Sequence, residues 1–222
     1  MSSNALFNRG LSHSTPFSRA LFVLCRALDL PVEYAILLGG TPHRTILLAM
    51  ALISFIKHTH WATRISQESM SPGAALFTGI SHSFGNLLNT VLFVATSRDG
   101  DGLPVHTIIG MAIFILGILV EWGSEIQRLR FKKDVKNRGR VYTKGFFGLT
   151  RHINYTGYLL WRTGFALAAA GWIWALVTCG LGAYKCLNSI IPELDEYCEK
   201  KYTNQWTKYK KDVPYKLFPF IL

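Results

Sequence analysis

Residues 163–184 of the chain read TGFALAAAGWIWALVTCGLGAY and contain no Asp, Glu, Lys or Arg. About 20 mainly apolar residues are enough for a helix to cross the hydrocarbon core of a bilayer. Apolar residues continue on both sides of this stretch, and aromatic residues follow Gly171. We therefore predict a C-terminal helical hairpin, with arms over residues 155–170 and 172–191 that turn at Gly171.

Composition supports a membrane protein and excludes several other classes. Half of the 222 residues are hydrophobic and 17% are charged, whereas a soluble chain carries roughly 25% charged residues. The cysteines are Cys25, Cys179, Cys186 and Cys198. They show neither zinc-binding nor disulfide-scaffold spacing, and His58 and His60 lack a third ligand, so no metal site is expected. We predict one all-α domain, a polytopic membrane bundle of about five spans.

Further spans are expected in the N-terminal half. Residues 103–120 and 69–97 also lack Asp, Glu, Lys and Arg, although the second stretch contains Asn86 and Asn89. Residues 45–56 are apolar but too short to cross a bilayer alone. Together with residues 32–40 they form either one interrupted span or two short pieces, so the side of Met1 stays open. We expect an internal span, rather than a cleavable signal peptide, to direct insertion.

Basic residues are concentrated beside the spans. The chain carries 24 Lys and Arg against 13 Asp and Glu, a formal net charge of +11. Within the strongly basic residues 123–154, Glu125 and Asp134 are the only acids. Positive charge next to apolar spans marks the cytosolic side, so we expect this segment and the C-terminal tail to be cytosolic. A nucleic-acid partner is not expected, because no recognised binding motif appears.

An arginine, a histidine, an amide and a phenol lie together where the basic segment enters the hairpin, in residues 150–157 (TRHINYTG). Arg151 and His152 could hold a phosphate or a carboxylate through charge-assisted hydrogen bonds. Asn154 supplies the amide, and Tyr155 could donate a proton to a buried substrate. The alternative is that Arg151 and His152 reach lipid headgroups while Tyr155 belongs to the aromatic belt.

Charged residues of the flanking segments are further candidates. Arg162 lies two to three turns inside the hairpin, where a charge is costly unless it is paired or hydrated; it has either a functional role or an acidic partner. Residues 127–133 (QRLRFKK) form either a topology anchor or a clamp for the phosphates of a nucleotide. Glu121, at the end of a span, is either a substrate-facing acid or an interfacial one.

An amphipathic helix is predicted on the membrane surface over residues 192–211. Pro192 suits a helix start, and Glu193, Asp195 and Glu196 fall in the first turn, where the helix dipole favours acids. These acids either cap the helix or bind ribose hydroxyls or an amine.

These motifs, in this order, resemble a superfamily of membrane steroid and sterol reductases, isoprenylcysteine carboxyl methyltransferases and phospholipid methyltransferases. Residues 151–157 are similar to the Arg-His-Pro-x-Tyr-x-Gly block, with Ile153 in place of Pro. Residues 127–132 resemble the Gln-basic-x-x-Phe-basic block of sterol reductases, and residues 195–219 resemble their tail. Thr203 stands where that tail has Gly, and Glu193 where the reductases carry Arg. The narrower resemblance is to small proteins with a steroid 5α-reductase-like C-terminal domain.

The resemblance implies an NADPH-dependent reductase of a carbon–carbon double bond in a lipophilic, steroid- or isoprenoid-like substrate, within the endoplasmic reticulum membrane. Tyr155 or Glu121 would supply the proton. Residues 123–222 would form the cofactor-binding half, and residues 1–122 the spans through which substrate enters from the bilayer. The residues expected around the cofactor are Gln127, Arg128, Lys132, Arg151, His152, Asn154, Arg162, Asp195, Glu196 and Tyr202.

The same resemblance leaves a methyltransferase as the alternative, which would use S-adenosylmethionine to modify a prenylated or phospholipid substrate. The short chain and the paired acids Asp195 and Glu196 favour it, whereas the tail and residues 127–132 favour the reductase. A non-catalytic membrane adaptor is a third possibility, and an arginine inside a span argues against it.

Overall fold

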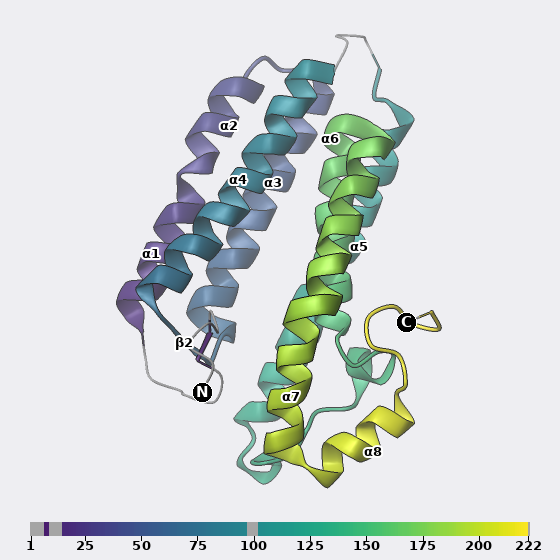
Figure 1. Cartoon of the computed structure of the whole chain (residues 1–222). Coiled ribbons are helices and arrows are strands. Elements are labelled where there is room, and N and C mark those ends of the chain that lie inside the picture. Colours follow the sequence, from purple (N-terminus) through teal and green to yellow (C-terminus); the bar gives the residue numbers. More distant parts are fainter. Residues whose placement is uncertain (1–6, 9–14, 97–101, 222) are drawn as a thin grey trace. The chain divides into compact units, whose positions relative to one another are not determined.

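The computed structural model of the protein describes residues 7–8, 15–96 and 102–221 (Figure 1). Its helices are α1 (Pro16–Ala27), α2 (Asp29–Leu37), α3 (Pro42–His60), α4 (Pro72–Thr96), α5 (Val105–Lys133), α6 (Ile153–Lys185), α7 (Ile191–Tyr202) and α8 (Asn204–Asp212). The two-residue strands β1 (Phe7–Asn8) and β2 (Ser69–Met70) pair antiparallel. The prediction of an all-α fold is confirmed.

The chain divides into two compact units. Unit 1 consists of Met1–Ile108 with Ala168–Ala170, and unit 2 of Ile109–Leu167 with Gly171–Leu222. The single domain and its division at residue 123 into a substrate-side half and a cofactor-binding half stay predictions.

The predicted hairpin is confirmed. Gly171 has a φ of +80°, which glycine adopts readily because it has no Cβ, and the helix labelled α6 reverses there (Figure 1). A Cβ on Gly182 would lie 2.6 Å from Leu159 Cδ2, so residues 23 positions apart in the sequence touch across the two arms. Leu159 also shares a buried cluster with Cys186 and Ile191.

Fewer helices qualify as membrane spans than the sequence predicts. Within the described residues, the segments long and apolar enough to cross a membrane number three, namely Pro42–Ile65, Val105–Lys133 and Ile153–Tyr202. The third segment has 50 residues and includes both arms of the hairpin. The segment predicted over residues 69–97 does form α4, which is not among these three, and its buried residues include the polar Asn86 and Asn89.

Glycine and proline separate the N-terminal apolar pieces. Gly39 and Gly40 both have positive φ, α2 ends before them at Leu37, and α3 begins at Pro42. The Thr41 hydroxyl accepts a hydrogen bond from the Arg44 amide and so caps α3. The apolar residues are therefore separate helices and not one interrupted span, but only α2 is short. The prediction that residues 45–56 are too short to cross a bilayer is wrong, because they lie within Pro42–Ile65, which is long enough.

The helical segments beside the spans have bounds of their own in the structure. The basic residues from 124 onward continue α5 without a break as far as Lys133. The tail helix predicted over residues 192–211 is divided at Thr203, which has φ +43° and ψ −114° and separates α7 from α8.

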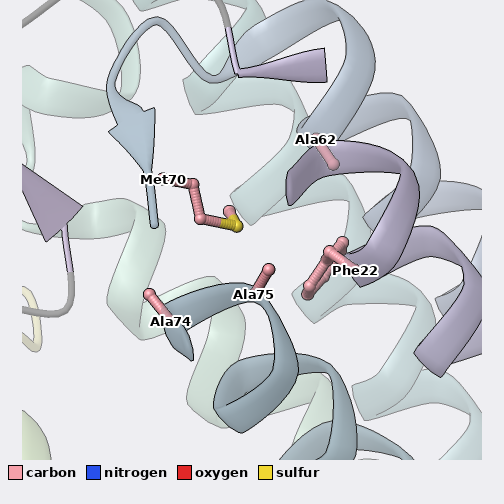
Figure 2. Close-up of a cluster of buried hydrophobic side chains, with 5 residues drawn as sticks. All are labelled: Phe22, Ala62, Met70, Ala74 and Ala75. Atoms are coloured by element: carbon pink, nitrogen blue, oxygen red, sulfur yellow. The ribbon is translucent and has the colours of Figure 1, made fainter. Parts of the chain in front are cut away.

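Unit 1 combines an apolar cluster with a buried polar network. Figure 2 shows the apolar cluster, in which Phe22 packs with Ala62, Met70, Ala74 and Ala75.

The polar network surrounds Arg26 of α1, which is fully buried. Its guanidinium donates to Asp29 Oδ2 at 2.5 Å, to Ser83 Oγ at 2.9 Å and to His58 Nδ1 at 3.3 Å. Asn86 of α4 donates to the same Asp29 oxygen at 3.2 Å. Ser83 and Asn86 of α4 therefore face other helices, as expected for polar groups in an apolar segment.

Unit 2 is held together by close contact between α5 and the first arm of α6. A Cβ at Gly117 would collide with the Trp161 amide, one at Gly157 with the Glu121 backbone, and one at Gly164 with the Phe114 backbone. Glycine at these positions lets the two backbones approach. This seam fixes the register between α5 and α6 and thereby sets Glu121 against the start of α6.

Candidate functional site

The centre of the candidate site is Glu125, a residue that the sequence motifs did not single out. It lies in α5, one turn after Glu121, and is 4% exposed. Its Oε2 accepts a hydrogen bond from Arg128 Nη2 at 2.5 Å, and its Oε1 accepts one from Asn154 Nδ2 at 2.9 Å. The carboxylate therefore joins the basic helix end to the first turn of α6. The signal that could have found it is its isolation as an acid among basic residues.

His152 and Asp195 form a second pair beside it. His152 Nε2 lies 2.9 Å from Asp195 Oδ1, and the imidazole is almost fully buried. Burial lowers the pKa of His152, although the hydrogen bond and the charge of Asp195 partly oppose this. A neutral imidazole that donates to a carboxylate must carry its proton on Nε2. The Tyr155 ring centroid lies 6.2 Å from that of His152.

Arg151 is engaged by the C-terminal tail. Its Nη1 donates to the carbonyl oxygens of Val213 at 2.7 Å and Pro214 at 2.8 Å. The side chain is buried, so main-chain carbonyls occupy donors that the sequence assigned to a cofactor.

Lys132, Tyr202 and Gln127 form the outer part of the site. Lys132 Nζ donates to Tyr202 Oη at 2.7 Å and to the Arg140 carbonyl at 2.6 Å. The ammonium group also lies 4.7 Å from the Tyr202 ring centroid. Gln127 Oε1 accepts from the Phe146 amide at 3.1 Å, so Gln127 secures the loop before α6.

Glu121 and Arg162 meet at Trp161, deeper in the α5–α6 pair. Trp161 Nε1 donates to Glu121 Oε2 at 2.5 Å. Arg162 Cζ lies 4.6 Å from the Trp161 ring centroid and 5.8 Å from that of Tyr158, which is cation–π geometry.

The acids Asp195 and Glu196 of α7 lie in different surroundings. Asp195 turns inward to His152, whereas Glu196 is on the exposed side of α7 and pairs with Lys200 at 2.5 Å. The structure therefore places Arg128 and Asn154 against Glu125 and pairs Asp195 with His152. Tyr155 lies beside His152 and packs against the buried cluster between the hairpin arms, and Glu196 stays on the surface.

The donor set suits an organic ligand. It offers carboxylates, an amide and two phenols from α5, α6 and α7, and the neutral imidazole of His152 just before α6. Among the residues that the structure describes, no group of three or more His, Cys, Asp or Glu is placed to hold a metal ion.

Comparison with known proteins gives one family and two kinds of relative. The family model described as a protein of unknown function, DUF1295, matches residues 83–213. A probable O-methyltransferase, ustE, of Ustilaginoidea virens is 30% identical over 87% of this chain and 82% of its own length.

Sterol reductases are also among the relatives, and they are matched over much smaller shares of their length. A 7-dehydrocholesterol reductase of Danio rerio is 31% identical over 38% of this chain and 18% of its own. A Delta(14)-sterol reductase of Dictyostelium discoideum is 24% identical over 55% of this chain and 30% of its own length. The chain thus spans less than a third of either reductase.

The family model covers more than half of the 222 residues, and the methyltransferase relative is covered almost throughout. The motifs at residues 127–132, 151–157 and 195–219 lie wholly or mostly inside the matched region. The chain belongs to the DUF1295 family, within the membrane superfamily of steroid 5α-reductase-like enzymes and methyltransferases that these motifs predicted.

Proposed function

We propose that this protein is a membrane methyltransferase that uses S-adenosylmethionine to methylate an oxygen atom of a lipophilic acceptor of the prenylated or phospholipid type. The observation that carries the proposal is the similarity to the probable O-methyltransferase, which extends over 82% of that chain. The two reductases are matched over only 18% and 30% of their own lengths. The protein would reside in the endoplasmic reticulum membrane, with residues 123–154 and the tail facing the cytosol.

The charges of the site support this choice. S-adenosylmethionine carries a sulfonium and an ammonium group together with ribose hydroxyls, which carboxylates bind well. Glu125 is buried and Asp195 partly buried, and both face the site. Arg151, a cation that would hold NADPH phosphates, is instead engaged by the tail carbonyls of Val213 and Pro214.

The residues would divide the work between binding and positioning. Asp195, Asn154 and Glu125 would bind the polar groups of the donor, and neutral His152 would keep Asp195 in place. When bound, S-adenosylmethionine supplies an electrophilic methyl carbon, and the protein contributes orientation and electrostatics. If the acceptor is a hydroxyl, its proton must be taken up by a base, and we assign that step to the carboxylate of Glu121. Tyr155, which the sequence predicts as a proton donor, would have no part in it.

A reductase remains the second candidate because of one feature. Arg128 and Lys132 project from the end of α5, in the block that resembles the sterol reductases, and the side chain of Arg128 is 38% exposed. Such an arginine is placed to meet a phosphate at the rim of the site. An NADPH-dependent reduction of a lipophilic double bond would use it in that way.

Binding experiments separate the two proposals. Detergent-purified protein would be titrated with S-adenosylmethionine and with NADPH by calorimetry, for the wild type, Asp195→Asn and the surface control Asp212→Asn. We expect saturable S-adenosylmethionine binding that is about tenfold weaker in Asp195→Asn, as expected when a charge-assisted bond is lost, and unchanged in the control. Saturable NADPH binding alone would establish the reductase instead, and binding of neither would contradict both.

The reaction is then tested with a labelled donor. Membranes containing the protein, given S-adenosylmethionine with a tritiated methyl group, should transfer the label to an organic-solvent-extractable product. Label that stays entirely in the aqueous phase would contradict a lipophilic acceptor.

A further inference from the structure

Residues 213–217 of the C-terminal tail, which we call the C-terminal strap, are bound to the start of α6. The Arg151 amide donates to the Tyr215 carbonyl and the His152 amide to the Lys216 carbonyl, both at 3.0 Å. The Arg151 guanidinium binds the carbonyls of Val213 and Pro214. These bonds tie four successive strap residues to Arg151 and His152.

Two threonines complete the attachment. Thr150 Oγ1 donates to the Lys216 carbonyl at 2.9 Å, and the Thr156 hydroxyl donates to the Leu217 carbonyl. Leu217 itself is fully buried with Leu159 and Cys186 between the hairpin arms. The strap is therefore held at its end by apolar packing as well as by hydrogen bonds.

The strap is attached at the residue that carries the site histidine. His152 binds the strap with its main chain and Asp195 with its side chain. The Trp206 ring of α8, which leads into the strap, lies 6.3 Å from the imidazole. His152 is thus enclosed by α6, α7 and the tail.

We infer that Arg151 is a positioning residue: it seats the C-terminal strap on the start of α6 and so holds His152 dry and fixed against Asp195. In this role the guanidinium acts through His152 and not by touching a ligand. The inference differs from the cofactor-contacting role that the sequence motif implies. Its consequence for donor binding rests on the proposed function.

Loss of the strap contacts should change the pKa of the His152 imidazole. The groups that face the imidazole are Asp195 of α7, Arg128 of α5, Arg151 and the Tyr155 ring. Because burial is the main cause that lowers the pKa of His152, entry of water should move it upward toward the ordinary value of about 6.5. A purely structural role elsewhere in the tail would leave this titration unchanged.

The experiment compares Arg151→Gln, Arg151→Lys and the exposed control Arg138→Gln in the full chain. Hydrogen exchange followed by mass spectrometry reports the His152 amide, and the ring signals of labelled histidine report its pKa. In Arg151→Gln we expect exchange at residue 152 to accelerate at least about tenfold. The pKa of His152 should rise, both because water enters and because the Arg151 charge that lowers it is lost. Arg151→Lys, which keeps the charge but not the fork of donors, should fall between wild type and Arg151→Gln.

Thr150→Val provides a second variant if Arg151→Gln does not fold. It removes a strap hydrogen bond while keeping the side-chain shape, and it should move exchange and pKa in the same direction by smaller amounts. If both readouts match the Arg138→Gln control in each folded variant, the inference is overturned.

Donor affinity links the strap to the proposed reaction. We expect S-adenosylmethionine to bind about tenfold more weakly to Arg151→Gln and to recover in part with Arg151→Lys. Faster exchange with unchanged affinity would show that the strap only stabilises the fold, against the inference. If the wild type binds no S-adenosylmethionine, the proposed function fails, while exchange and titration still decide whether Arg151 seats the strap.

Discussion

Glu125 receives hydrogen bonds from two residues that lie on different helices, Arg128 and Asn154. In Glu125→Gln the amide keeps one acceptor but loses the negative charge that both donors face. We expect S-adenosylmethionine affinity to fall about tenfold, the cost of a charge-assisted bond. Calorimetric titration checks this, with Glu199→Gln as the matched control because Glu199 is exposed and pairs with Lys210. Equal affinities for the two variants would remove Glu125 from the site.

A second prediction for a single residue concerns His152 and the pH dependence of stability. Burial lowers its pKa in the folded protein below the value of about 6.5 in the unfolded chain. As the pH falls below about 6.5, the unfolded state therefore binds more protons, and stability decreases until the folded-state pKa is passed.

Because a single proton is involved, the free energy of unfolding can change by at most about 1.4 kcal/mol per pH unit. Thermal unfolding in detergent between pH 7.5 and 5 should show a larger acid loss for the wild type than for His152→Gln. The same pH dependence in both proteins would mean that His152 is not the group responsible.

Thr203 stands where the resembling tails carry glycine, and the structure gives a reason for that glycine. Its φ of +43° and ψ of −114° are close to the first central position of a type II′ turn, which favours glycine. Thr203→Gly should relieve strain at the junction of α7 and α8 and raise stability by about 1 kcal/mol.

The matched control for this change is Thr207→Gly. It places the same new residue inside α8, where glycine costs about 1 kcal/mol relative to a good helix former. Denaturant unfolding of both variants should therefore show shifts of opposite sign, and two shifts of the same sign would contradict the strain argument.

Between elements, the α5–α6 seam depends on glycine at specific positions. In Gly157→Ala the added Cβ would meet the backbone of Glu121, which cannot move aside as a flexible side chain can. We expect a loss of about 1–3 kcal/mol, typical of overpacking. Gly180→Ala in the second arm meets nothing within 4 Å and should be neutral or stabilising. Thermal unfolding of the two variants provides the comparison.

The sequence predicted elements better than it predicted partners. The hairpin and its turn at Gly171 followed from composition, because an uncharged apolar run with a central glycine has few other solutions. Glu125 and the buried Arg26 network were missed, because the pattern within one helix does not say which other helix it will face. Arg151 was assigned to a ligand for the same reason: its true acceptors, Val213 and Pro214, lie more than 60 residues away.

At the scale of the whole molecule, unit 2 constrains which segments share a side of the membrane. The strap binds residues 150–156, so the tail and the basic segment before α6 must lie on one face. The first arm of the hairpin, from Ile153 to the turn, is about 27 Å long at 1.5 Å per residue, close to the roughly 30 Å of the hydrocarbon core. The turn at Gly171 should therefore reach the opposite face.

Cysteine labelling in sealed microsomes with the cytosolic side outward tests this arrangement. Lys136→Cys in the basic segment and Lys211→Cys in the tail, both exposed, should react with a membrane-impermeant maleimide before detergent is added. Trp172→Cys beside the turn, where the native side chain is 56% exposed, should react only after permeabilisation, and the wild type sets the background from its four native cysteines. The strap makes Lys136→Cys and Lys211→Cys inseparable in this assay, so opposite labelling of these two would contradict the structure of unit 2, whereas reversed labelling of all three would contradict only the cytosolic assignment.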